Sequence, residues 1–240
     1  MKRKISVDSG HSTFVFSAPP SPTVPVRGTD LLFPVNRIFC VGRNYEAHAK
    51  EMGMAVDREA PFYFMKSASS VVASGATVPY APGTSNLHHE IELVVAIGKP
   101  VFCATEEDAP AAIYGYACGL DMTRRDIQFK ARDKGRPWDL SKNFENSAVI
   151  SEIVRVSESG LIQSGDISLS VNKEPRQSGN VSDLIWSVPE LIADLSKYYH
   201  LQPGDLLYTG TPAGVGPVER GDVITGSIDQ VGEIEFTIAN

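Results

Sequence analysis

Residues 87–95 constrain the fold more than any other stretch of this 240-residue chain. Glu90 and Glu92 stand two positions apart and lead into aliphatic residues, and this composition predicts a β-strand. Side chains two apart on a strand point to the same face, so both carboxylates would project side by side from a strand whose later half is buried. Like charges held so close cost free energy unless they are neutralised, and a divalent cation is the simplest counter-charge. An exposed strand end with two solvated carboxylates is the alternative.

A third acidic residue follows another predicted core strand. Residues 113–120 are largely apolar, and Asp121 stands where that strand would emerge, although an aspartate taken alone at such a position is more often the N-cap of the segment that follows. Three carboxylates without paired cysteines make an oxygen-rich site, which Mg²⁺ or Mn²⁺ prefers and Zn²⁺ does not. His88 and His89 adjoin these acids, but adjacent strand residues point to opposite faces, so they cannot both be ligands.

A histidine and a glutamate share one face of a short helix predicted between Gly42 and Gly53. His48 and Glu51 are three positions apart, so their side chains can touch, and Asn44 is the expected N-cap of this helix. The pair is either a base held by a carboxylate or a surface ion pair.

Basic residues gather in the stretch 124–142, which departs from the charge balance of the rest of the chain. It holds seven of the 22 lysines and arginines and only three acidic residues. A solvated helix and loop would have this composition, and so would a mobile cover that draws an anionic substrate into a cleft.

A glycine-rich loop, residues 209–216, follows a short predicted strand. It is not a P-loop, because no Gly-Lys-Ser/Thr follows, and it opens no helix, so it is not a dinucleotide-binding fingerprint. Its backbone amides and the hydroxyl of Thr211 are able to cradle a carboxylate. A tight turn between strands is the alternative.

The chain divides into an N-terminal arm and one larger domain. Residues 1–36 form the arm, whose proline-rich segment 18–25 predicts an extended connector, and we expect the first dozen residues to be disordered. Residues 37–240 contain several short apolar strands and a helix that begins at Ser187, with Glu190 completing a capping box. We therefore expect an α+β, β-rich fold.

Composition excludes several classes of protein. The formal net charge of -7 provides no basic field for nucleic-acid binding. No apolar run approaches the roughly 18 residues that a membrane helix needs, and no signal-peptide core follows the basic N-terminus. The three cysteines are far apart and fit neither a disulfide framework nor a Cys-x-x-Cys metal site. We expect a cytoplasmic protein with no nucleic-acid or membrane partner.

Six blocks of sequence occur in a characteristic order. They are Val41-Gly42-Arg43-Asn44-Tyr45, the His48/Glu51 pair, His88-His89-Glu90-Ile91-Glu92-Leu93, Gly119-Leu120-Asp121-Met122-Thr123-Arg124-Arg125-Asp126, Lys142-Asn143-Phe144 and Thr209-Gly210-Thr211-Pro212-Ala213-Gly214-Val215-Gly216-Pro217. From about Arg37 to the C-terminus, the chain closely resembles the fumarylacetoacetate hydrolase family, in its acylpyruvase and fumarylpyruvate hydrolase branch. The resemblance implies a mixed β-sandwich roll with flanking helices, usually a homodimer.

The resemblance also implies roles for individual residues. The expected metal ligands, for Mg²⁺ or Mn²⁺, are Glu90, Glu92 and Asp121. The residues that match the catalytic machinery are His48 and Glu51, which activate water, and Lys142, which we choose to stabilise an oxyanion. The residues that match the substrate site are Tyr45, Arg125, Gln128 and Thr211. One departure is Ser67, which stands where many relatives have a proline after the lysine that matches Lys66, so we assign Lys66 no role.

Members of this family split a 2,4-dioxo acid between C3 and C4, so the resemblance implies hydrolysis of an acylpyruvate, with fumarylpyruvate of gentisate degradation the expected substrate. A 2-oxo acid decarboxylase acting on oxaloacetate is one alternative, and it would need no attacking water. A metal-dependent carboxylate-binding module is another, although it would need no positioned base. The sequence does not place the basic partner of a distal carboxylate, for which Arg27, Arg132 and Arg136 are all candidates.

Overall fold

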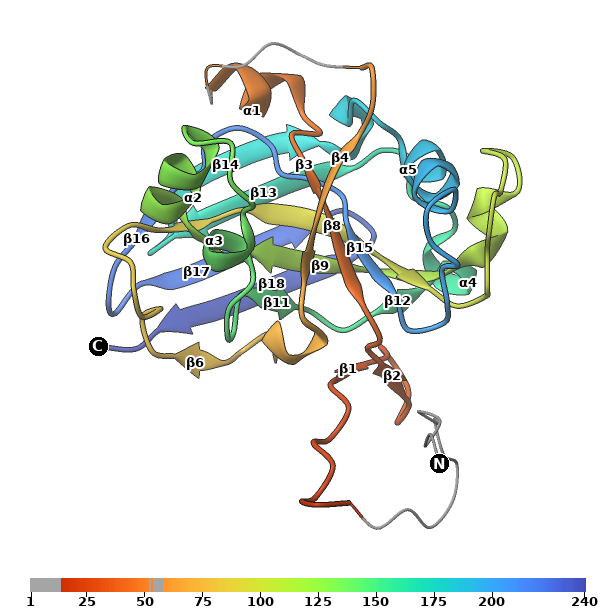
Figure 1. The fold of residues 1–240 in the computed structure, drawn as a ribbon, viewed down its shortest axis with the longest axis horizontal. Coiled ribbons are helices and arrows are strands. Elements are labelled where there is room, and N and C mark those ends of the chain that lie inside the picture. Colours follow the sequence, from red (N-terminus) through yellow and green to blue (C-terminus); the bar gives the residue numbers. More distant parts are fainter. Residues whose placement is uncertain (1–13, 52, 54–57) are drawn as a thin grey trace, which may run out of the picture.

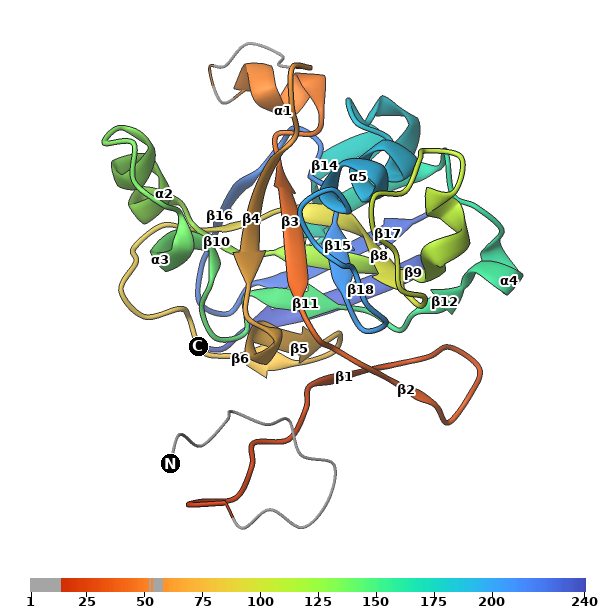
Figure 2. The same cartoon turned by 45° about the vertical axis from the view of Figure 1, so that its right-hand side comes forward.

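Two β-sheets packed against each other form the body of the molecule (Figures 1 and 2). The computed structural model describes residues 14–51, 53 and 58–240. The larger sheet has the order β4 (Phe62–Lys66), β3 (Ile38–Gly42), β15 (Leu206–Tyr208), β8 (Ile91–Ile97), β9 (Ile113–Asp121), β11 (Ala148–Ile150) and β5 (Val71–Ala73), and β12 (Val154–Arg155) also pairs with β9. The second sheet has the order β14 (Glu174–Asn180), β13 (Asp166–Val171), β17 (Val223–Ile228), β18 (Gly232–Ile238) and β6 (Thr77–Val78).

Smaller elements surround these sheets. A three-stranded sheet has the order β10 (Thr123–Arg124), β7 (Leu87–His89) and β16 (Gly216–Val218), and β1 (Thr23–Pro25) pairs with β2 (Leu32–Pro34). The α-helices are α1 (Glu46–Glu51), α2 (Arg125–Arg132), α3 (Asp139–Lys142), α4 (Val156–Ser159) and α5 (Val188–Leu195), and the 3₁₀-helices are Ala68–Ser70, Ala109–Ala112 and Val181–Asp183. Within the described residues, no helix is both long and apolar enough to cross a membrane.

The predicted α+β, β-rich sandwich roll is confirmed, and burial explains why its central strand is apolar apart from Glu92. Every residue of β8 is buried. One of its faces packs against the second sheet, where Leu93 joins the same cluster as Ile167 and Phe236. The other face, with Val94, packs in a separate cluster that includes Ile38. A strand covered on both faces needs no polar alternation, which is why its sequence reads as a continuous apolar run from Leu93 onward.

The acidic stretch is not one continuous strand. β7 ends at His89, β8 begins at Ile91, and Glu90 lies in the break between them. At this point the chain leaves the three-stranded sheet and enters the larger one. The carbonyl oxygen of Glu90 accepts the N–H of Asp121 at 2.8 Å, so the break stays attached to the end of β9.

Part of the N-terminal segment, for which we expected a loosely held arm, is packed. β1 and β2 form a hairpin, and the side chains of Val24, Val26 and Phe33 are buried in the cluster that contains Ile38. The buried side chains belong to apolar residues that alternate with other residues among the prolines. The disorder expected for the first dozen residues lies outside the described residues, and the domain boundary at residue 36 stays a prediction.

The segment before α1 is also arranged differently from the prediction. Asn44 is not the N-cap of this helix, because its side chain bonds elsewhere: Nδ2 donates to the carbonyl oxygens of Trp186 at 2.9 Å and Thr209 at 2.8 Å, and Oδ1 accepts the N–H of Trp186 at 2.7 Å. Asn44 therefore ties the loop after β3 to two distant segments of the chain. At the other helix, the predicted capping box between Ser187 and Glu190 is present.

Candidate active site

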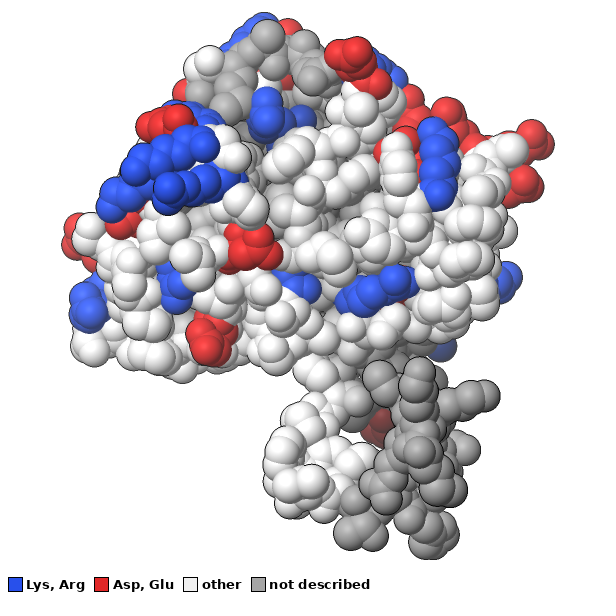
Figure 3. All heavy atoms as spheres, in the orientation of Figure 1, with Lys and Arg blue, Asp and Glu red and all other residues white. Residues whose placement is uncertain are grey.

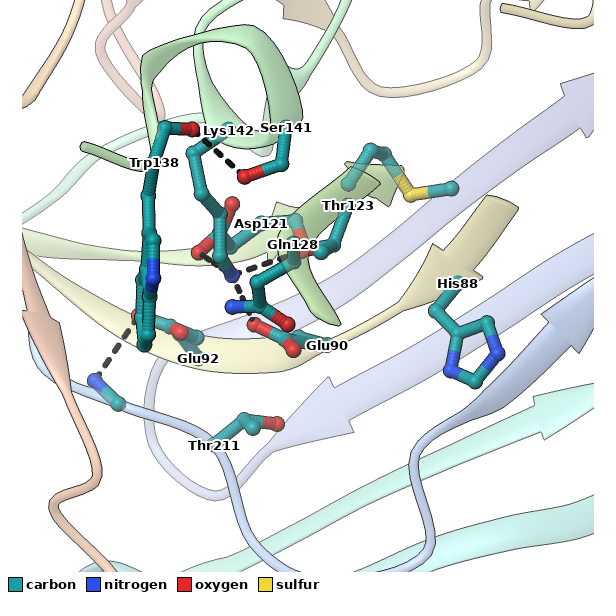
Figure 4. A network of polar contacts seen from close by, with 12 residues as sticks. His88, Glu90, Glu92, Asp121, Thr123, Gln128, Trp138, Ser141, Lys142 and Thr211 are labelled. Atoms are coloured by element: carbon teal, nitrogen blue, oxygen red, sulfur yellow. Dashed lines mark hydrogen bonds and ion pairs between the residues drawn. The ribbon is translucent and has the colours of Figure 1, made fainter. Parts of the chain in front are cut away.

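Three buried carboxylates meet where β8 begins and β9 ends. We call Glu90, Glu92 and Asp121 the acidic triad; one ligand oxygen of each lies within 4.8 Å of the others. β8 and β9 are antiparallel, with Ile91 opposite Leu120, so the start of one strand lies beside the end of the other. The structure thus brings together the three acids that the sequence singled out, and Figure 4 shows their side chains converging.

A lysine from α3 lies at the centre of this cluster. The ammonium of Lys142 donates hydrogen bonds to Glu90 at 2.6 Å, to Asp121 at 2.6 Å and to the hydroxyl of Thr123 at 2.7 Å (Figure 4). An ammonium has three N–H donors, so all of them are engaged. The side chain of Lys142 is 3% exposed, which means that its charge depends on these acids rather than on water.

Two further cations contact the acidic triad from other parts of the chain. The ammonium of Lys66, at the end of β4, lies 2.8 Å from Asp121 Oδ1. The guanidinium of Arg125, at the start of α2, donates to Glu90. Together with Lys142 they place three formal positive charges against the three negative charges of the triad.

Two of the acids differ in how well they are compensated. Burial alone would raise the pKa of Glu90, but the charges of Lys142 and Arg125 outweigh it and hold that pKa below its usual range. Glu92 is different: burial, together with the charges of Asp121 and Glu90, raises its pKa well above the usual range. Its carboxylate accepts the backbone N–H of Gly210 at 2.9 Å. A buried carboxylate with so little positive compensation fits a divalent cation, as does a ligand set made only of oxygen atoms.

The predicted dyad is in contact and is attached to the glycine-rich loop. His48 Nδ1 lies 3.3 Å from Glu51 Oε2, and the two oxygens of that carboxylate accept the N–H of Gly214 at 3.1 and 3.2 Å. Burial lowers the pKa of His48, although the nearby charge of Glu90 and the bond to Glu51 act in the opposite direction. The imidazole is therefore neutral at pH 7, with Nδ1–H directed at Glu51 and Nε2 left to accept a proton.

Arg125 and Gln128 face the same pocket from one side of α2. The guanidinium of Arg125 donates to the side-chain oxygen of Gln128, and its Nε donates to His88 Nδ1 at 3.3 Å. Burial, followed by the charge of Arg125, lowers the pKa of His88 to about 4. His88 is therefore a neutral acceptor for Arg125, and Figure 4 shows it set apart from the acidic triad.

A glutamine that the sequence did not reveal fixes the hydroxyl of Thr211. Gln177, on β14, is 2% exposed, and its Nε2 donates to Thr211 Oγ1 at 2.7 Å and to the carbonyl oxygen of Pro212 at 2.8 Å. Its side-chain oxygen accepts the N–H of Ile91 at 3.1 Å and lies 2.9 Å from His89 Nδ1. Since Thr211 Oγ1 accepts from Gln177, its own proton is available for another acceptor.

One pocket contains most of the predicted site residues. Its lining residues are Val41, Gly42, Arg43, His48, Phe64, Glu90, Glu92, Asp121, Arg125, Gln128, Phe129, Arg132, Trp138, Lys142 and Thr211. Tyr45 is not among them; it is 2% exposed, and its hydroxyl has no hydrogen-bond partner among the described residues. Glu51 is not among them either, but it contacts His48, which is. Trp138 packs edge-on against Phe62 with ring centroids 5.0 Å apart, so aromatic side chains form one wall.

The basic stretch lies beside this pocket. Figure 3 shows lysine and arginine side chains gathered over α2, on the face where α2 lies in Figure 1. Arg132 from this stretch lines the pocket, whereas Lys130 and Arg136 are exposed residues outside its lining. Arg27 is not part of the lining either, since its guanidinium donates to the carbonyl oxygen of Val231. The structure therefore leaves Arg132 as the pocket-lining member of the three arginines that the sequence suggested.

Two functional candidates were missed, and each had a sequence signal. Lys66 directly follows four residues of an apolar strand, and a lysine buried at such a position requires acidic partners. Gln177 stands in a polar strand with exposed neighbours, so only its pairing with distant segments shows that it is buried.

Comparison with known proteins identifies relatives of this chain. The family model for the fumarylacetoacetate (FAA) hydrolase C-terminal domain matches residues 37–239. The chain is 57% identical to fumarylpyruvate hydrolase from Ralstonia sp over 189 residues, which cover 78% of this chain and 98% of that protein. It is 42% identical to oxaloacetate tautomerase YcgM from Escherichia coli (strain K12) over 204 residues, which cover 85% of this chain and 93% of that protein.

A solved structure shares both the fold and much of the sequence. The crystal structure of fumarylpyruvate hydrolase from Pseudomonas aeruginosa, in complex with Mn²⁺ and pyruvate, superposes with a TM-score of 0.91 and 46% sequence identity. The match covers 95% of this chain and 99% of that one.

Proposed function

This chain belongs to the fumarylacetoacetate hydrolase family, and from that premise we propose that it hydrolyses the C3–C4 bond of a 2,4-dioxo acid with the help of a divalent metal ion. Fumarylpyruvate, which would give fumarate and pyruvate, is the substrate that we propose. One observation carries this proposal: the acidic triad and a neutral histidine held by a carboxylate line the same pocket. A binding module needs no such base, which argues against a non-catalytic role.

Glu90, Glu92 and Asp121 would hold the metal ion, and Mg²⁺ and Mn²⁺ suit this ligand set equally. When bound, the ion supplies a Lewis acid that polarises the 2-oxo group and stabilises negative charge on the pyruvyl unit. Thr211 and Arg125, which also line the pocket, offer donors to the substrate carboxylate and the oxo oxygens.

His48 is the proposed base. Its Nε2 takes a proton from water, while Glu51 holds Nδ1–H and so fixes the orientation of the ring. The oxygen of that water attacks C4. The C3–C4 bond then breaks, C4 becomes the carboxyl carbon of the acid product, and the enolate of pyruvate takes at C3 the proton that His48 accepted from water.

Lys142 remains our candidate for stabilising the oxyanion on C4. Its ammonium is fully engaged with Glu90, Asp121 and Thr123, so it must release one bond before it can donate to the substrate. The bond to the neutral hydroxyl of Thr123 is the least costly one to exchange, because the other two join opposite charges.

A tautomerase acting on oxaloacetate is the second candidate, because a relative with that name shares 42% identity with this chain. It would use the same pocket for a 2-oxo acid but would move a proton at C3 without breaking a carbon–carbon bond. His48 would then exchange a proton with carbon instead of with water. The decarboxylase that we considered from the sequence would need no attacking water.

Loss of ultraviolet absorbance tests the proposal. Fumarylpyruvate, acetylpyruvate and enol-oxaloacetate are each mixed with the protein in Mn²⁺, in Mg²⁺ and in EDTA, and products are separated by chromatography. Metal-dependent formation of fumarate and pyruvate supports the hydrolase. Ketonisation of enol-oxaloacetate without cleavage of either dioxo acid would move the assignment to a tautomerase, and release of CO₂ from oxaloacetate would move it to a decarboxylase. His200→Ala, an exposed histidine, serves as a control for His48→Ala.

We also propose, from the family resemblance, that the protein is a cytoplasmic homodimer and that residues 37–240 form its catalytic domain. Size-exclusion chromatography with light scattering tests the dimer.

A further inference from the structure

Two arginines line the pocket without a buried carboxylate to balance them. The acids that line it are the acidic triad, and these already face Lys142, Lys66 and Arg125. Arg43 and Arg132 therefore add positive charge that no acid of the lining offsets. With a divalent cation in the triad as well, this pocket would favour a ligand that carries more than one negative charge.

Arg43 lies at the end of β3, where the chain turns toward α1. Among the described residues, no carbonyl or carboxylate oxygen accepts a hydrogen bond from its guanidinium, and its buried Nε has no partner. The guanidinium lies over the ring of Phe62, 5.6 Å from the centroid, so the planar group is held while its outer N–H donors stay available.

The backbone of Arg43 is held in an uncommon conformation. Its φ is 67°, in the left-handed region that residues with a Cβ rarely adopt. The next residue fixes it there, because Asn44 is bonded to Trp186 and Thr209 and its backbone carbonyl accepts the N–H of Ile185 at 2.8 Å. Such conformations persist where surrounding contacts impose them, and they concentrate at ligand-binding sites.

Arg132 approaches from the last turn of α2. It packs over the ring of Phe129, 4.8 Å from the centroid, and its charge partner is the neighbouring Asp133, at 3.2 Å. That carboxylate is 65% exposed and the arginine side chain 34%, so water screens this pair. A substrate carboxylate inside the pocket would therefore readily replace Asp133 as the partner of Arg132.

We propose that Arg43 and Arg132 form a subsite for the distal carboxylate of a diacid substrate, at the opposite end from the 2-oxo acid group. This proposal rests on the proposed function, which already names a diacid, and adds the residues that would distinguish that diacid from an acylpyruvate that ends in an alkyl group. Arginine suits the task because its planar fork binds a carboxylate through two parallel hydrogen bonds.

Kinetics with matched substrates and variants tests the subsite. Fumarylpyruvate ends in a carboxylate and acetylpyruvate ends in a methyl group. In Arg43→Met and in Arg132→Met, kcat/KM for fumarylpyruvate should fall by about 10- to 100-fold, because each change removes charged hydrogen bonds to the substrate. For acetylpyruvate, the same variants should stay within about threefold of the unmodified protein. Arg136→Met removes an exposed arginine of the same basic stretch, and it should leave both substrates within that range.

The outcomes separate a subsite from a structural role. Equal loss with both substrates would show that Arg43 and Arg132 only support the pocket, and no loss with either would show that they do not meet the substrate. Both results overturn the proposal.

A binding measurement keeps this test independent of hydrolysis. Calorimetry compares 2-oxoadipate with 2-oxohexanoate, which differ at the distal end, in the presence of Mn²⁺. The unmodified protein should bind the diacid at least about tenfold more tightly, and Arg43→Met should abolish that difference. If neither dioxo acid is cleaved, the proposed function fails, yet this preference would still support the subsite. Equal affinity for the two acids would overturn the subsite even if hydrolysis is observed.

Discussion

Replacing Lys142 by methionine removes one positive charge from the acidic triad while keeping a side chain of similar length. In the unmodified protein the ammonium donates to Glu90 and Asp121, both at 2.6 Å, from a site that is almost fully buried. A divalent cation would bind to the same carboxylates, so the lysine opposes it by charge repulsion. Lys142→Met should therefore bind Mn²⁺ more tightly than the unmodified protein, although it loses turnover.

The expected size of the effect follows from the burial. Removing one partner of a buried ion pair costs about 3–5 kcal/mol, because the remaining charges are left uncompensated. For a chain of this length, that lowers the melting temperature of the metal-free protein by roughly 6–20 °C. Mn²⁺ at 100 times its Kd adds about 2.7 kcal/mol of stability, which recovers much of the loss. Removal of a unit charge next to the ligands should strengthen Mn²⁺ binding at least about tenfold.

Differential scanning fluorimetry in EDTA and in Mn²⁺, together with calorimetric titration of Mn²⁺, measures both effects. Lys130→Met removes an exposed lysine of α2 and should change neither the melting temperature nor the Kd. Weaker Mn²⁺ binding by folded Lys142→Met would mean that the lysine positions the carboxylates rather than opposing the ion. That result would refute the charge-balance reasoning.

Three further predictions follow from the same cluster. His48→Ala should lower kcat about 10²–10⁴-fold and leave the affinity for Mn²⁺ unchanged. Since burial lowers the pKa of His48 from 6.5, the acid limb of the kcat/KM profile of the unmodified protein should lie below pH 6.5. Near-normal turnover of the variant, or an acid limb above pH 7, would contradict the role of His48 as the base. Burial raises the pKa of Glu92, so ionising this carboxyl group costs stability as pH rises above 4.5. Glu92→Gln should therefore raise the melting temperature in EDTA at pH 8 while weakening Mn²⁺ binding. An unchanged melting temperature would argue against a carboxylate that is costly to ionise in the folded protein. Gln177→Met should destabilise the protein by about 1–3 kcal/mol, because it leaves His89 and a backbone N–H without an acceptor. It should also raise KM more than it lowers kcat. Gln163→Met, which replaces an exposed glutamine, is the control, and equal behaviour of the two variants would remove Gln177 from the site.

The parts of this structure that the sequence predicted depend on spacing along the chain. Glu90 and Glu92 are near neighbours in sequence, so even a break between β7 and β8 leaves their carboxylates close together. His48 and Glu51 meet because residues three apart share a helix face. Ser187 and Glu190 make a capping box for the same local reason. Such pairs can be predicted from their spacing in the sequence without knowing the tertiary fold.

The parts that were wrong or missed depend on contacts between distant segments. Asn44 has the residue type of an N-cap, but its side chain reaches Trp186 and Thr209, which tertiary folding brings beside it. The prolines around β1 and β2 predict an extended connector, whereas the valines and Phe33 of this hairpin are buried against the larger sheet. Neither arrangement leaves a pattern within a single window of sequence.

The cations around the acidic triad show why charge balance is harder to predict than ligand identity. Lys66, Lys142 and Arg125 come from β4, α3 and α2, and each lies far in sequence from the carboxylate that it contacts. The number of these cations nevertheless affects the net charge that the pocket presents to a substrate. By formal charge the three cations balance the three carboxylates, so a bound divalent ion would leave a surplus of positive charge, and Arg43 and Arg132 would add to it. A dianionic substrate would offset more of this surplus than a monoanionic acylpyruvate would, and uncompensated charge in a buried pocket is costly. The charge of the cluster and the two arginines of the pocket lining thus favour the same class of substrate, a 2,4-dioxo diacid.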